Sequence, residues 1–498
     1  MKYVTILAII TATAFAQGPL APPGAPAPLM RTLSQIEART PIGVPDAVTT
    51  ATIDILQPGS YVLTGPVAVA AGTAISIKAD FVTLDLNGFL ISSTASPAAG
   101  SGVEIFGVRK HVTVKNGNIA GGVTYTNGSQ ITFSGPGFTH GVFVADSATK
   151  LVRVIDVSVS GVAGHGIYAG FNTSTAERCS VDTALTAGIS AVTVSNSNAS
   201  GIGGAAIEAH TASDCTGISL NGPGVSSRVA TNCHGTGVAA PGVVATTVSN
   251  CVGVSETYRG ISASNVANSN GYSNAGKGIV AETTLASTGR STEDRGIDSK
   301  VTSGSFGTST DSSGIVGDVA VGSSAASAHF IGMWTEVAGD SYATSGSMVN
   351  LSGGTYQVLS ALDSDVSSNC YGRSTGNGPG INGTVTTGSQ GTSPGLYGVN
   401  TRIALNARGQ GGNVGVYGYA TLNCFGSGIS GIEGKISMNS YGEGGNAGWG
   451  LSLSSIASYC LGDAGFGMNA LYSPLAIGCQ HEGAANTITS PSKHLGTP

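Results

Sequence analysis

One group of polar residues in the middle of the chain has the residue types of an acid–base site. Glu208 and His210 alternate along one short segment, and Arg228 follows His210 by 18 residues. On a common face, Arg228 could neutralise the carboxylate of an acidic sugar while His210 or Glu208 accepts a proton. The series continues in steps of 18 with Thr246, Ser264, Glu282, Lys300 and Asp318. Its alternating charges are equally compatible with a solvated surface of weak ion pairs.

Three cations recur at the same interval of 18 residues: Arg259, Lys277 and Arg295. Stacked on one face, they would repel one another unless anions lay nearby. A bound acidic glycan would supply such anions, and so would neighbouring carboxylates such as Glu293 and Asp294. The three cations are therefore candidate substrate-binding residues, with local neutralisation as the alternative.

Further candidates lie outside these two series. His140 and His165 each precede a glycine and an aliphatic residue, and charged residues lie near them at Asp146, Lys150, Arg153 and Asp156. A calcium-dependent lyase needs carboxylates that converge on one face together with a base, but spacing alone does not bring these residues together. Asp363 and Asp365 form an acidic pair of the kind that a glycosidase uses at a defined separation.

An insertion is expected at residues 121–139, where Gly, Thr and Asn are frequent. It contains two aromatic residues, Tyr125 and Phe133. Solenoid proteins often place functional loops at such insertions, which makes both residues candidate substrate-binding groups. A tolerated surface loop is the alternative interpretation.

A strict 18-residue repeat must position all these side chains. A small residue recurs at every step through Cys179, Ser197, Cys215, Cys233, Cys251, Ser269, Ser287, Ser305 and Ser323, and a Gly-aliphatic pair follows it by nine residues. This period suits one turn of a β-solenoid, whose successive rungs stack about 4.8 Å apart. We therefore expect an all-β chain coiled into roughly 20 rungs, with equivalent side chains stacked in columns along the rod.

A polar column accompanies the small residues, with Asn196, Asp214, Asn232, Asn250 and Asn268 directly before them. Stacked Asn side chains at a turn can hydrogen-bond to one another and to the turn backbone. The sequence therefore predicts a structural asparagine ladder at these five positions.

The early strands carry a family resemblance. The segment 58–63 (PGSYVL), followed by 84–88 (LDLNG) and 114–117 (VKNG), resembles the opening of secreted bacterial right-handed parallel β-helix proteins of the pectate-lyase-like superfamily. The resemblance implies a right-handed coil, whereas the repeat length alone also allows three hexapeptides of a left-handed one. It implies little about activity, because the superfamily contains lyases, hydrolases, epimerases, adhesins and proteins without a known role.

The chain order suggests an exported rod with short terminal additions. Residues 1–16 have the pattern of a signal peptide, 17–30 form a Pro/Ala-rich spacer, and 31–52 an N-terminal cap with a short amphipathic helix. The β-helix is expected over 53–480, with an irregular waist at 325–369 and a tail at 481–498. The mature chain shows no apolar stretch long enough to span a bilayer. We expect a secreted, surface or periplasmic protein.

The amino-acid composition limits the classes of partner and cofactor that we expect for this protein. Charged residues make up 10% of the chain, the formal net charge is −6, and glycine contributes 77 residues. No basic block provides a nucleic-acid footprint. Of the eight cysteines, Cys215, Cys233 and Cys251 share a column with serine, which favours free thiols over disulfides. No metal-ligand motif is present, so no cofactor is expected apart from calcium in the case of a lyase.

These observations favour an exported β-helix rod that acts as a surface, adhesive or polysaccharide-binding protein. Its expected partner is an extracellular polysaccharide or a cell-surface glycan. The alternative is a polysaccharide lyase, glycoside hydrolase or epimerase that acts on uronate-containing glycans at Glu208, His210 and Arg228. The sequence leaves the oligomeric state open.

Overall fold

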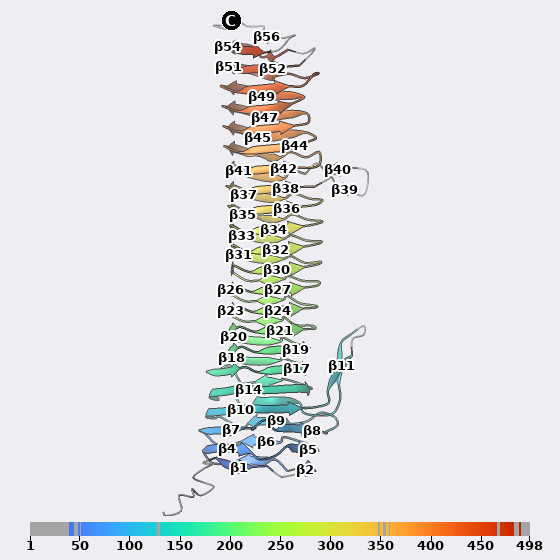
Figure 1. Ribbon diagram of the computed structural model, residues 1–498, viewed down its shortest axis with the longest axis vertical. Helices are drawn as coiled ribbons and strands as arrows, with labels where there is room; N and C mark the ends of the chain where they lie inside the picture. Colours follow the sequence, from blue (N-terminus) through green and yellow to red (C-terminus); the bar gives the residue numbers. More distant parts are fainter. Residues whose placement is uncertain are drawn as a thin grey trace, which may run out of the picture.

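The chain forms one straight, right-handed parallel β-helix of about 23 turns (Figure 1). The computed structural model describes residues 39–43, 48–49, 51–126, 130–346, 349–351, 355–357, 359–465, 469–482 and 488–489. The predicted fold class is confirmed. The predicted signal peptide and spacer, and most of the predicted cap helix, lie outside the described residues.

Each rung contributes strands to three faces, which we call A, B and C in chain order. Face A begins at the small residue of the repeat and leads to a turn, face B leads back from that turn, and face C follows after a bend. Face A contains β2 (Val48–Thr49), β5 (Val67–Val69), β8 (Leu90–Ser93), β17 (Ser180–Ala184), β19 (Asn198–Ile202), β21 (Thr216–Ser219), β24 (His234–Gly237), β27 (Val252–Ser255), β30 (Asn270–Ser273), β32 (Thr288–Ser291), β34 (Phe306–Ser309), β36 (Ser324–Ser327), β38 (Tyr342–Ser345), β42 (Tyr371–Ser374), β44 (Gln390–Ser393), β46 (Arg408–Gly411), β48 (Phe425–Gly428), β50 (Tyr441–Gly444), β52 (Leu461–Ala464) and β55 (Gln480–Glu482).

Faces B and C are separate strands in some rungs and one bent strand in others. Face B contains β3 (Ile53–Ile55), β6 (Ile75–Ile77), β9 (Ser101–Ile105), β13 (His140–Val144), β15 (Ile167–Tyr168), β22 (Val225–Ser226), β25 (Val243–Val244), β28 (Ile261–Ser262), β53 (Leu471–Tyr472) and β56 (Ile488–Thr489). Face C contains β1 (Thr40–Ile42), β4 (Gly59–Leu63), β7 (Val82–Asp85), β16 (Ser174–Glu177), β23 (Val229–Thr231), β26 (Thr247–Ser249), β29 (Asn265–Ala267) and β54 (Leu475–Ile477). Bent strands that span B and C are β18 (Ile189–Ser195), β20 (Ile207–Ser213), β31 (Ile279–Leu285), β33 (Ile297–Ser303), β35 (Ile315–Val321), β37 (Met333–Gly339), β41 (Leu362–Ser368), β43 (Ile381–Thr387), β45 (Tyr397–Leu405), β47 (Val414–Leu422), β49 (Ser430–Met438) and β51 (Leu451–Ser458). In two early rungs, β10 (Lys110–Ala120) and β14 (Lys150–Val162) instead continue from face C into face A.

Two hairpins leave the rod at the turn between faces A and B. One is formed by β11 (Thr124–Thr126) and β12 (Thr132–Ser134), within the predicted insertion. The other is formed by β39 (Val349–Leu351) and β40 (Thr355–Gln357). The rungs on either side of this second hairpin stay in register, with β37 paired to β41 and β38 to β42. The predicted irregular waist therefore consists of regular rungs and one inserted hairpin.

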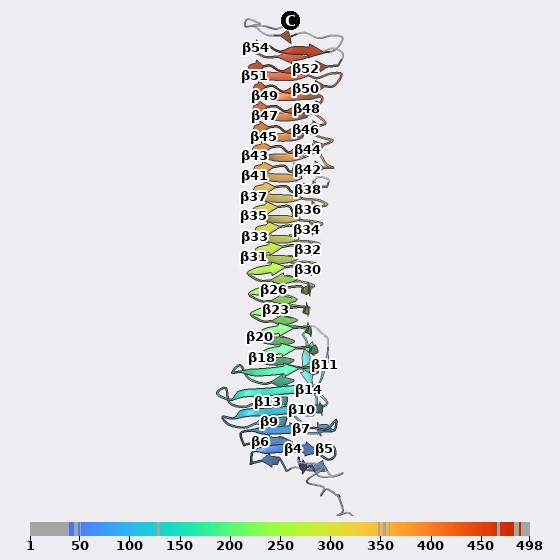
Figure 2. The same ribbon diagram turned by 60° about the vertical axis from the view of Figure 1, so that its left-hand side comes forward.

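Strand pairing also extends beyond the predicted limits of the β-helix. β1 and β2, inside the segment predicted as a cap, pair in parallel with β4 and β5. At the other end β56 pairs with β53. Figure 2 shows the uninterrupted stack from the side.

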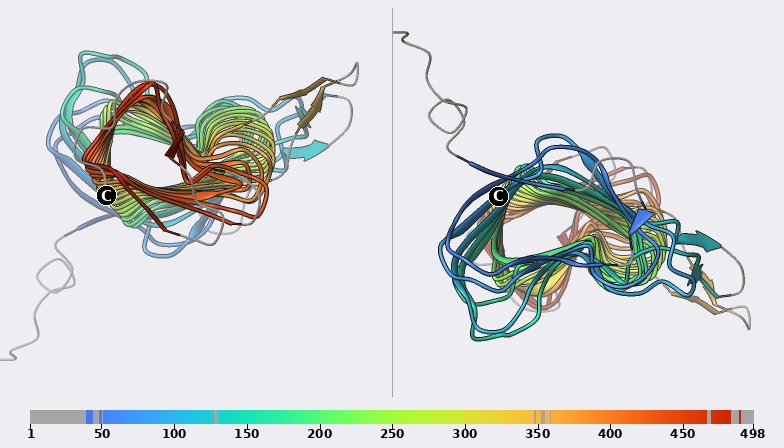
Figure 3. Two further views of the ribbon diagram at one scale, coloured as in Figure 1. Left: turned by 90° about the horizontal axis from the view of Figure 1, so that it is seen from above. Right: turned by 90° about the horizontal axis from the view of Figure 1, so that it is seen from below.

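The cross-section has a larger and a smaller lobe, with both hairpins at the tip of the smaller one (Figure 3). Glycines explain why the smaller lobe is thin. A Cβ atom on Gly253 of face A would lie 2.1 Å from the carbonyl oxygen of Gly260, and one on Gly260 would lie 2.3 Å from the amide nitrogen of Tyr272. The Gly-aliphatic pairs of the repeat therefore keep two backbones in contact while the aliphatic residue, such as the fully buried Ile261, fills the core.

The turn between faces C and A explains the polar column. Asn196, Asp214, Asn232, Asn250 and Asn268 all have φ between 49° and 54°. Asn, Asp and Gly adopt this left-handed conformation at the lowest cost, and glycine occupies the same turn in later rungs. Among these five side chains one pair is hydrogen-bonded, with Asn232 Nδ2 donating to Asp214 Oδ1 at 3.1 Å. The backbone requirement thus explains the column more fully than a side-chain ladder does.

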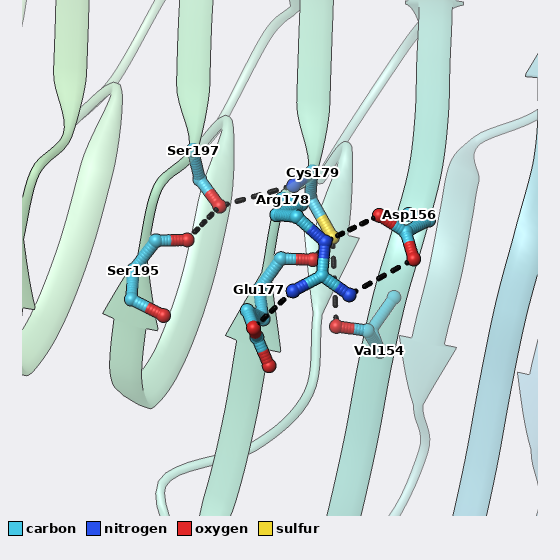
Figure 4. A network of polar contacts seen from close by, with 7 residues as sticks. All are labelled: Val154, Asp156, Glu177, Arg178, Cys179, Ser195 and Ser197. Carbon is cyan, nitrogen blue, oxygen red and sulfur yellow. Dashed lines mark hydrogen bonds and ion pairs between the residues drawn. The ribbon is translucent and has the colours of Figure 1, made fainter.

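The small residue after this turn is buried and bonded to the next rung. The Cys179 amide donates to Ser197 Oγ at 3.1 Å, and that hydroxyl donates to the Ser195 carbonyl at 2.7 Å (Figure 4). All eight cysteines are free and buried. Residues 18 apart in the central rungs are therefore vertical neighbours, as the repeat predicts.

Candidate functional site

Two hollows of the rod lie along the bend between faces B and C, which we call the B–C groove. Two outward columns line it. The face-B column includes Glu208, Asp298, Trp334, Tyr417 and Tyr472, which stack through an unbroken series of parallel pairings. The second column, at the bend itself, contains the series from His210 to Asp318 that the sequence predicts. A straight groove with one side-chain position per rung can contact a linear ligand along its length.

The C-terminal part of the groove contains a hollow of about 650 Å³. Its walls carry the exposed rings of Tyr417 and Tyr472, with exposed fractions of 42% and 38%. Lys435 lies between them, with Nζ 4.8 Å from the ring centre of Tyr419 and 3.2 Å from its hydroxyl. Arg402 completes the polar lining. The hollow thus combines aromatic surfaces with hydrogen-bond donors.

A second hollow, of about 400 Å³, lies nearer the middle of the rod. Trp334 is 51% exposed there. Beside it, burial raises the pKa of the Asp363 carboxyl, although hydrogen bonds from Asn382 and Ser360 oppose the rise. Asp365, a bend residue of the same rung, also raises the pKa of the Asp363 carboxyl through its charge. The predicted acidic pair thus lies in the groove.

The three predicted cations stack on consecutive rungs at the edge of face B. Lys277 and Arg295 both form ion pairs with Asp298, the latter at 2.8 Å. Although burial of Asp298 opposes it, these two cations keep the pKa of its carboxyl below the ordinary value. Arg259 donates to Ser262 Oγ at 3.2 Å. Two of the three cations are therefore neutralised by a neighbouring carboxylate. That carboxylate is Asp298 and not Glu293 or Asp294.

An aromatic and imidazole cluster occupies face B of the early rungs. His140 stacks on Phe143 with ring centres 4.1 Å apart, and His165 lies 5.0 Å from Tyr168. The backbone amide of His165 donates to His140 Nδ1 at 3.0 Å. Burial, together with the charge of His165, lowers the pKa of His140 to about 4, and burial lowers the pKa of His165 as well. Both imidazoles are therefore neutral at pH 7.

The predicted catalytic residues border this cluster. Glu208 accepts a hydrogen bond from Ser190 Oγ at 2.9 Å, and its charge acts on His165 in the direction that raises the imidazole pKa. His210 stacks on Phe171 at 5.8 Å. Arg228 lies one rung further along the bend, and within the described residues no carboxylate pairs with it. The structure thus brings Glu208 and His210 to one end of the groove, beside His165 and Tyr168.

The predicted aromatic pair of the insertion lies elsewhere. Tyr125 and Phe133 face each other across the first hairpin, with ring centres 5.7 Å apart. Their rings approach Gly201 and Gly203 at the smaller lobe, since a Cβ there would lie 3.2 and 3.1 Å from them. This hairpin packs on the rod near the tip of the smaller lobe, so neither ring lines the B–C groove.

The acidic residues suggested for calcium do not converge. Asp156 is held by two hydrogen bonds from Arg178, at 2.7 and 3.0 Å, in the turn between faces C and A (Figure 4). These bonds keep the pKa of the Asp156 carboxyl below its ordinary value. Within the described ranges no three His, Cys, Asp or Glu side chains are placed to hold a metal ion. The same part of the chain contains no helix with the length and apolar character of a membrane span.

The aromatic residues of the later rungs were not recognised as site residues from the sequence. Trp334, Tyr417 and Tyr472 stack in register with Glu208, but the later rungs vary in length, which hides their common phase. Counting residues from the Gly-aliphatic pair of each rung would have placed Trp334, Tyr417 and Tyr472 in one column.

Comparisons with known proteins add little to this geometry. No protein-family model matches the chain, and the search of curated proteins gave no match. Among solved structures, the A-module of the mannuronan C-5 epimerase AlgE6 from Azotobacter vinelandii matches 87% of this chain and 92% of its own length, at 11% identity and a TM-score of 0.20. Similarity this low carries no argument about function.

Proposed function

We propose that the protein binds an extended polysaccharide chain along the B–C groove. The observation that carries the proposal is the single column that holds the exposed rings of Trp334, Tyr417 and Tyr472 on a straight stack of rungs. Pyranose rings present apolar C–H faces that pack against aromatic rings, and their hydroxyl groups need hydrogen-bond partners.

The groove supplies both kinds of contact. Aromatic rings alternate along it with polar side chains such as Asn400, Arg402 and Glu433. Because each rung advances the column by about 4.8 Å, consecutive sugar units of an extended chain meet consecutive rungs. Many weak contacts along one chain then add up to useful affinity. Binding of this kind needs no catalytic group.

Affinity electrophoresis against neutral, acidic and cationic soluble polysaccharides tests the proposal. For the polysaccharide that binds, we expect Tyr417→Ala with Tyr472→Ala to weaken binding about a hundredfold, because loss of each ring removes about 1.4 kcal/mol. Tyr459→Asn is the matched control. It removes an even more exposed ring from the turn between faces C and A and introduces the residue most common there. Equal binding by the double variant and the control would contradict the proposal.

A second candidate function is proton abstraction from a uronate unit, the step shared by a polysaccharide lyase and an epimerase. It is favoured by the neutral imidazoles of His140 and His165 beside Glu208. A neutral His165 or an ionised Glu208 can accept the proton α to a uronate carboxylate, and the unpaired guanidinium of Arg228 can hold that carboxylate. The resulting carbanion either expels the 4-O substituent, as in a lyase, or is reprotonated on the other face, as in an epimerase.

Proton NMR in D₂O tests this candidate directly. Incubation with a uronate polymer should deplete the signal of the proton α to the carboxylate, either by exchange with deuterium or, when the chain is cleaved, by formation of a C4–C5 double bond. Glu208→Gln and Arg228→Ala should each reduce exchange at least tenfold, whereas Arg290→Ala, on face A, should not. If the wild-type protein leaves this proton unexchanged, the catalytic candidate fails while polysaccharide binding stands.

A further inference from the structure

Face A carries a second aromatic surface, separate from the B–C groove. Its first outward column runs in register through Phe306, Ser324, Tyr342, Tyr371, Gln390, Arg408, Phe425 and Tyr441. Five of these eight neighbours on consecutive rungs carry aromatic rings, which lie on the outside of the rod.

The rings of this column form two stacks along the rod. Tyr342 and Tyr371 stack with ring centres 5.2 Å apart and an angle of 1° between their planes. Further along, the guanidinium of Arg408 lies 4.8 Å above the ring centre of Phe425, which in turn stacks on Tyr441 at 5.3 Å. Stacked in this way, the rings turn their faces to one another and their edges outward, and they form an apolar stripe along the column.

A hollow of about 570 Å³ lies beside the rungs that separate these two stacks. It is lined by Tyr371, Arg373, Thr375, Thr392 and Gln410, with Tyr371 Oη 3.5 Å from Thr392 Oγ1. Its lining contains no carboxylate, and within the described residues Arg373 forms no ion pair. Arg373, the cation of the lining, therefore favours an acidic ligand, and Arg408 adds a second positive charge to the same strand face, two residues before Gln410.

The path of the chain places this surface on another side of the rod from the B–C groove. Face A leads to the tip of the smaller lobe and face B leads back from it, so their outward side chains point in opposite directions (Figure 3). One extended ligand cannot lie on both surfaces at once.

We propose that face A between β38 and β48 is a second polysaccharide-binding surface, specific for an acidic glycan, so that one rod joins two glycan chains. The proposal rests on the proposed function of the B–C groove. The acidic residues Glu443 and Asp463, at the next two rungs of face A, mark its C-terminal limit. The ligand's acidic groups are carboxylates or sulfates, since both pair with guanidinium groups.

A two-chain capture experiment tests the proposal. Beads coated with the polysaccharide that binds the B–C groove are loaded with protein, washed, and offered fluorescent alginate, which is carboxylated, or fluorescent carrageenan, which is sulfated. We expect wild-type protein to capture at least one of them. Tyr371→Ala with Arg373→Gln should retain the bead-bound protein but reduce capture at least tenfold. Arg290→Ala, an outward face-A cation outside the hollow, should leave capture unchanged.

The outcomes separate the two proposals. If the Tyr371/Arg373 variant still captures the acidic chain, the face-A proposal is overturned. A dimer of rods that bridges the two chains through two B–C grooves would give this result. Protein that binds the beads in a Tyr417- and Tyr472-dependent way but captures no acidic chain also overturns the face-A proposal, while the B–C groove stands. A third outcome is that the acidic chain binds through Tyr371 and Arg373 while loss of Tyr417 and Tyr472 affects no binding. In that case face A is a binding surface, the B–C groove is not, and the rod does not join two chains.

Discussion

The main-chain amide of Cys233 donates a hydrogen bond to the thiol of Cys251, which lies on the next rung, at an N–S distance of 3.4 Å. The same thiol donates to the carbonyl oxygen of Ser249 at 3.2 Å. Where the next residue of the column is Ser269, its hydroxyl accepts from the Cys251 amide at 3.0 Å and donates to the Ala267 carbonyl at 2.7 Å. Cysteine and serine alternate because each both accepts and donates within the same small space.

Substitution of Cys251 should therefore separate hydrogen bonding from size. Cys251→Ser should change the free energy of unfolding by less than about 0.5 kcal/mol, whereas Cys251→Val should cost about 2 kcal/mol because it leaves the buried Cys233 amide without an acceptor. Urea unfolding followed by circular dichroism measures both. Equal losses for Ser and Val would show that the column selects for size alone.

Three of the buried thiols, those of Cys179, Cys370 and Cys424, should be unreactive in the folded protein. Burial raises the pKa of Cys179 to about 11 and also raises the pKa of Cys370 and Cys424, and the protonated thiol is a poor nucleophile. We expect these three thiols to stay unmodified by a thiol reagent at pH 8 in the native state, as mapped by mass spectrometry, and all eight thiols to react after unfolding without reductant. A smaller number after unfolding would reveal a disulfide.

Two glycines should respond in opposite ways to substitution. A Cβ on Gly271 would lie 2.2 Å from the Gly278 carbonyl oxygen, whereas Gly304 has a φ of 57° and no heavy atom within 4 Å of the added Cβ. Gly271→Ala should lower the free energy of unfolding by about 3 kcal/mol, because the backbones of the smaller lobe must separate. Gly304→Asn should change it by less than about 0.5 kcal/mol. Thermal unfolding compares the two, and similar losses would contradict the explanation for the thin lobe.

The turn column distinguishes backbone conformation from side-chain bonding. Asn250 has a φ of 54°, and no side-chain hydrogen bond joins it to Asn232 or Asn268 within the described structure. Asn250→Ala should cost about 1 kcal/mol, whereas Asn250→Gly should be close to neutral. An equal loss in both variants, measured by urea unfolding, would instead indicate a side-chain ladder.

The stability of the early rungs should depend on pH through His140. Its pKa is about 4 in the folded protein and near 6.5 in an unfolded chain. Between these values the unfolded chain takes up a proton that the folded protein does not, so stability falls as the pH drops from 6.5 towards 4. We expect a loss of about 2 kcal/mol, allowing for the partly exposed ring.

His140→Gln keeps an acceptor for the His165 amide but removes this titration. The free energy of unfolding of the variant, measured by urea titration at several pH values, should vary less steeply across the same window. His165 retains its own smaller contribution because burial lowers its pKa as well. An unchanged slope would show that His140 does not control the acid sensitivity.

The 18-residue period was enough to predict the coil, because in a stacked solenoid residues that lie one repeat apart in the sequence are in contact. Cys215, Cys233 and Cys251 are vertical neighbours for this reason. The period did not reveal why particular residues occupy each column. The left-handed φ at Asn250 and the close backbone approach at Gly253 depend on the turn geometry and on distances between strands, which the sequence repeat does not specify.

By itself, the sequence determined that equivalent residues stack, because strand pairing between identical rungs repeats one register. Only the tertiary structure decided which columns share a surface, because that depends on the angle at which face B bends into face C. The bend set the face-B column of Glu208, Trp334 and Tyr472 beside the column that contains His210. The position of the first hairpin at the other turn kept Tyr125 and Phe133 out of this groove, and the path of the side chains gave Lys277 and Arg295 a common partner in Asp298.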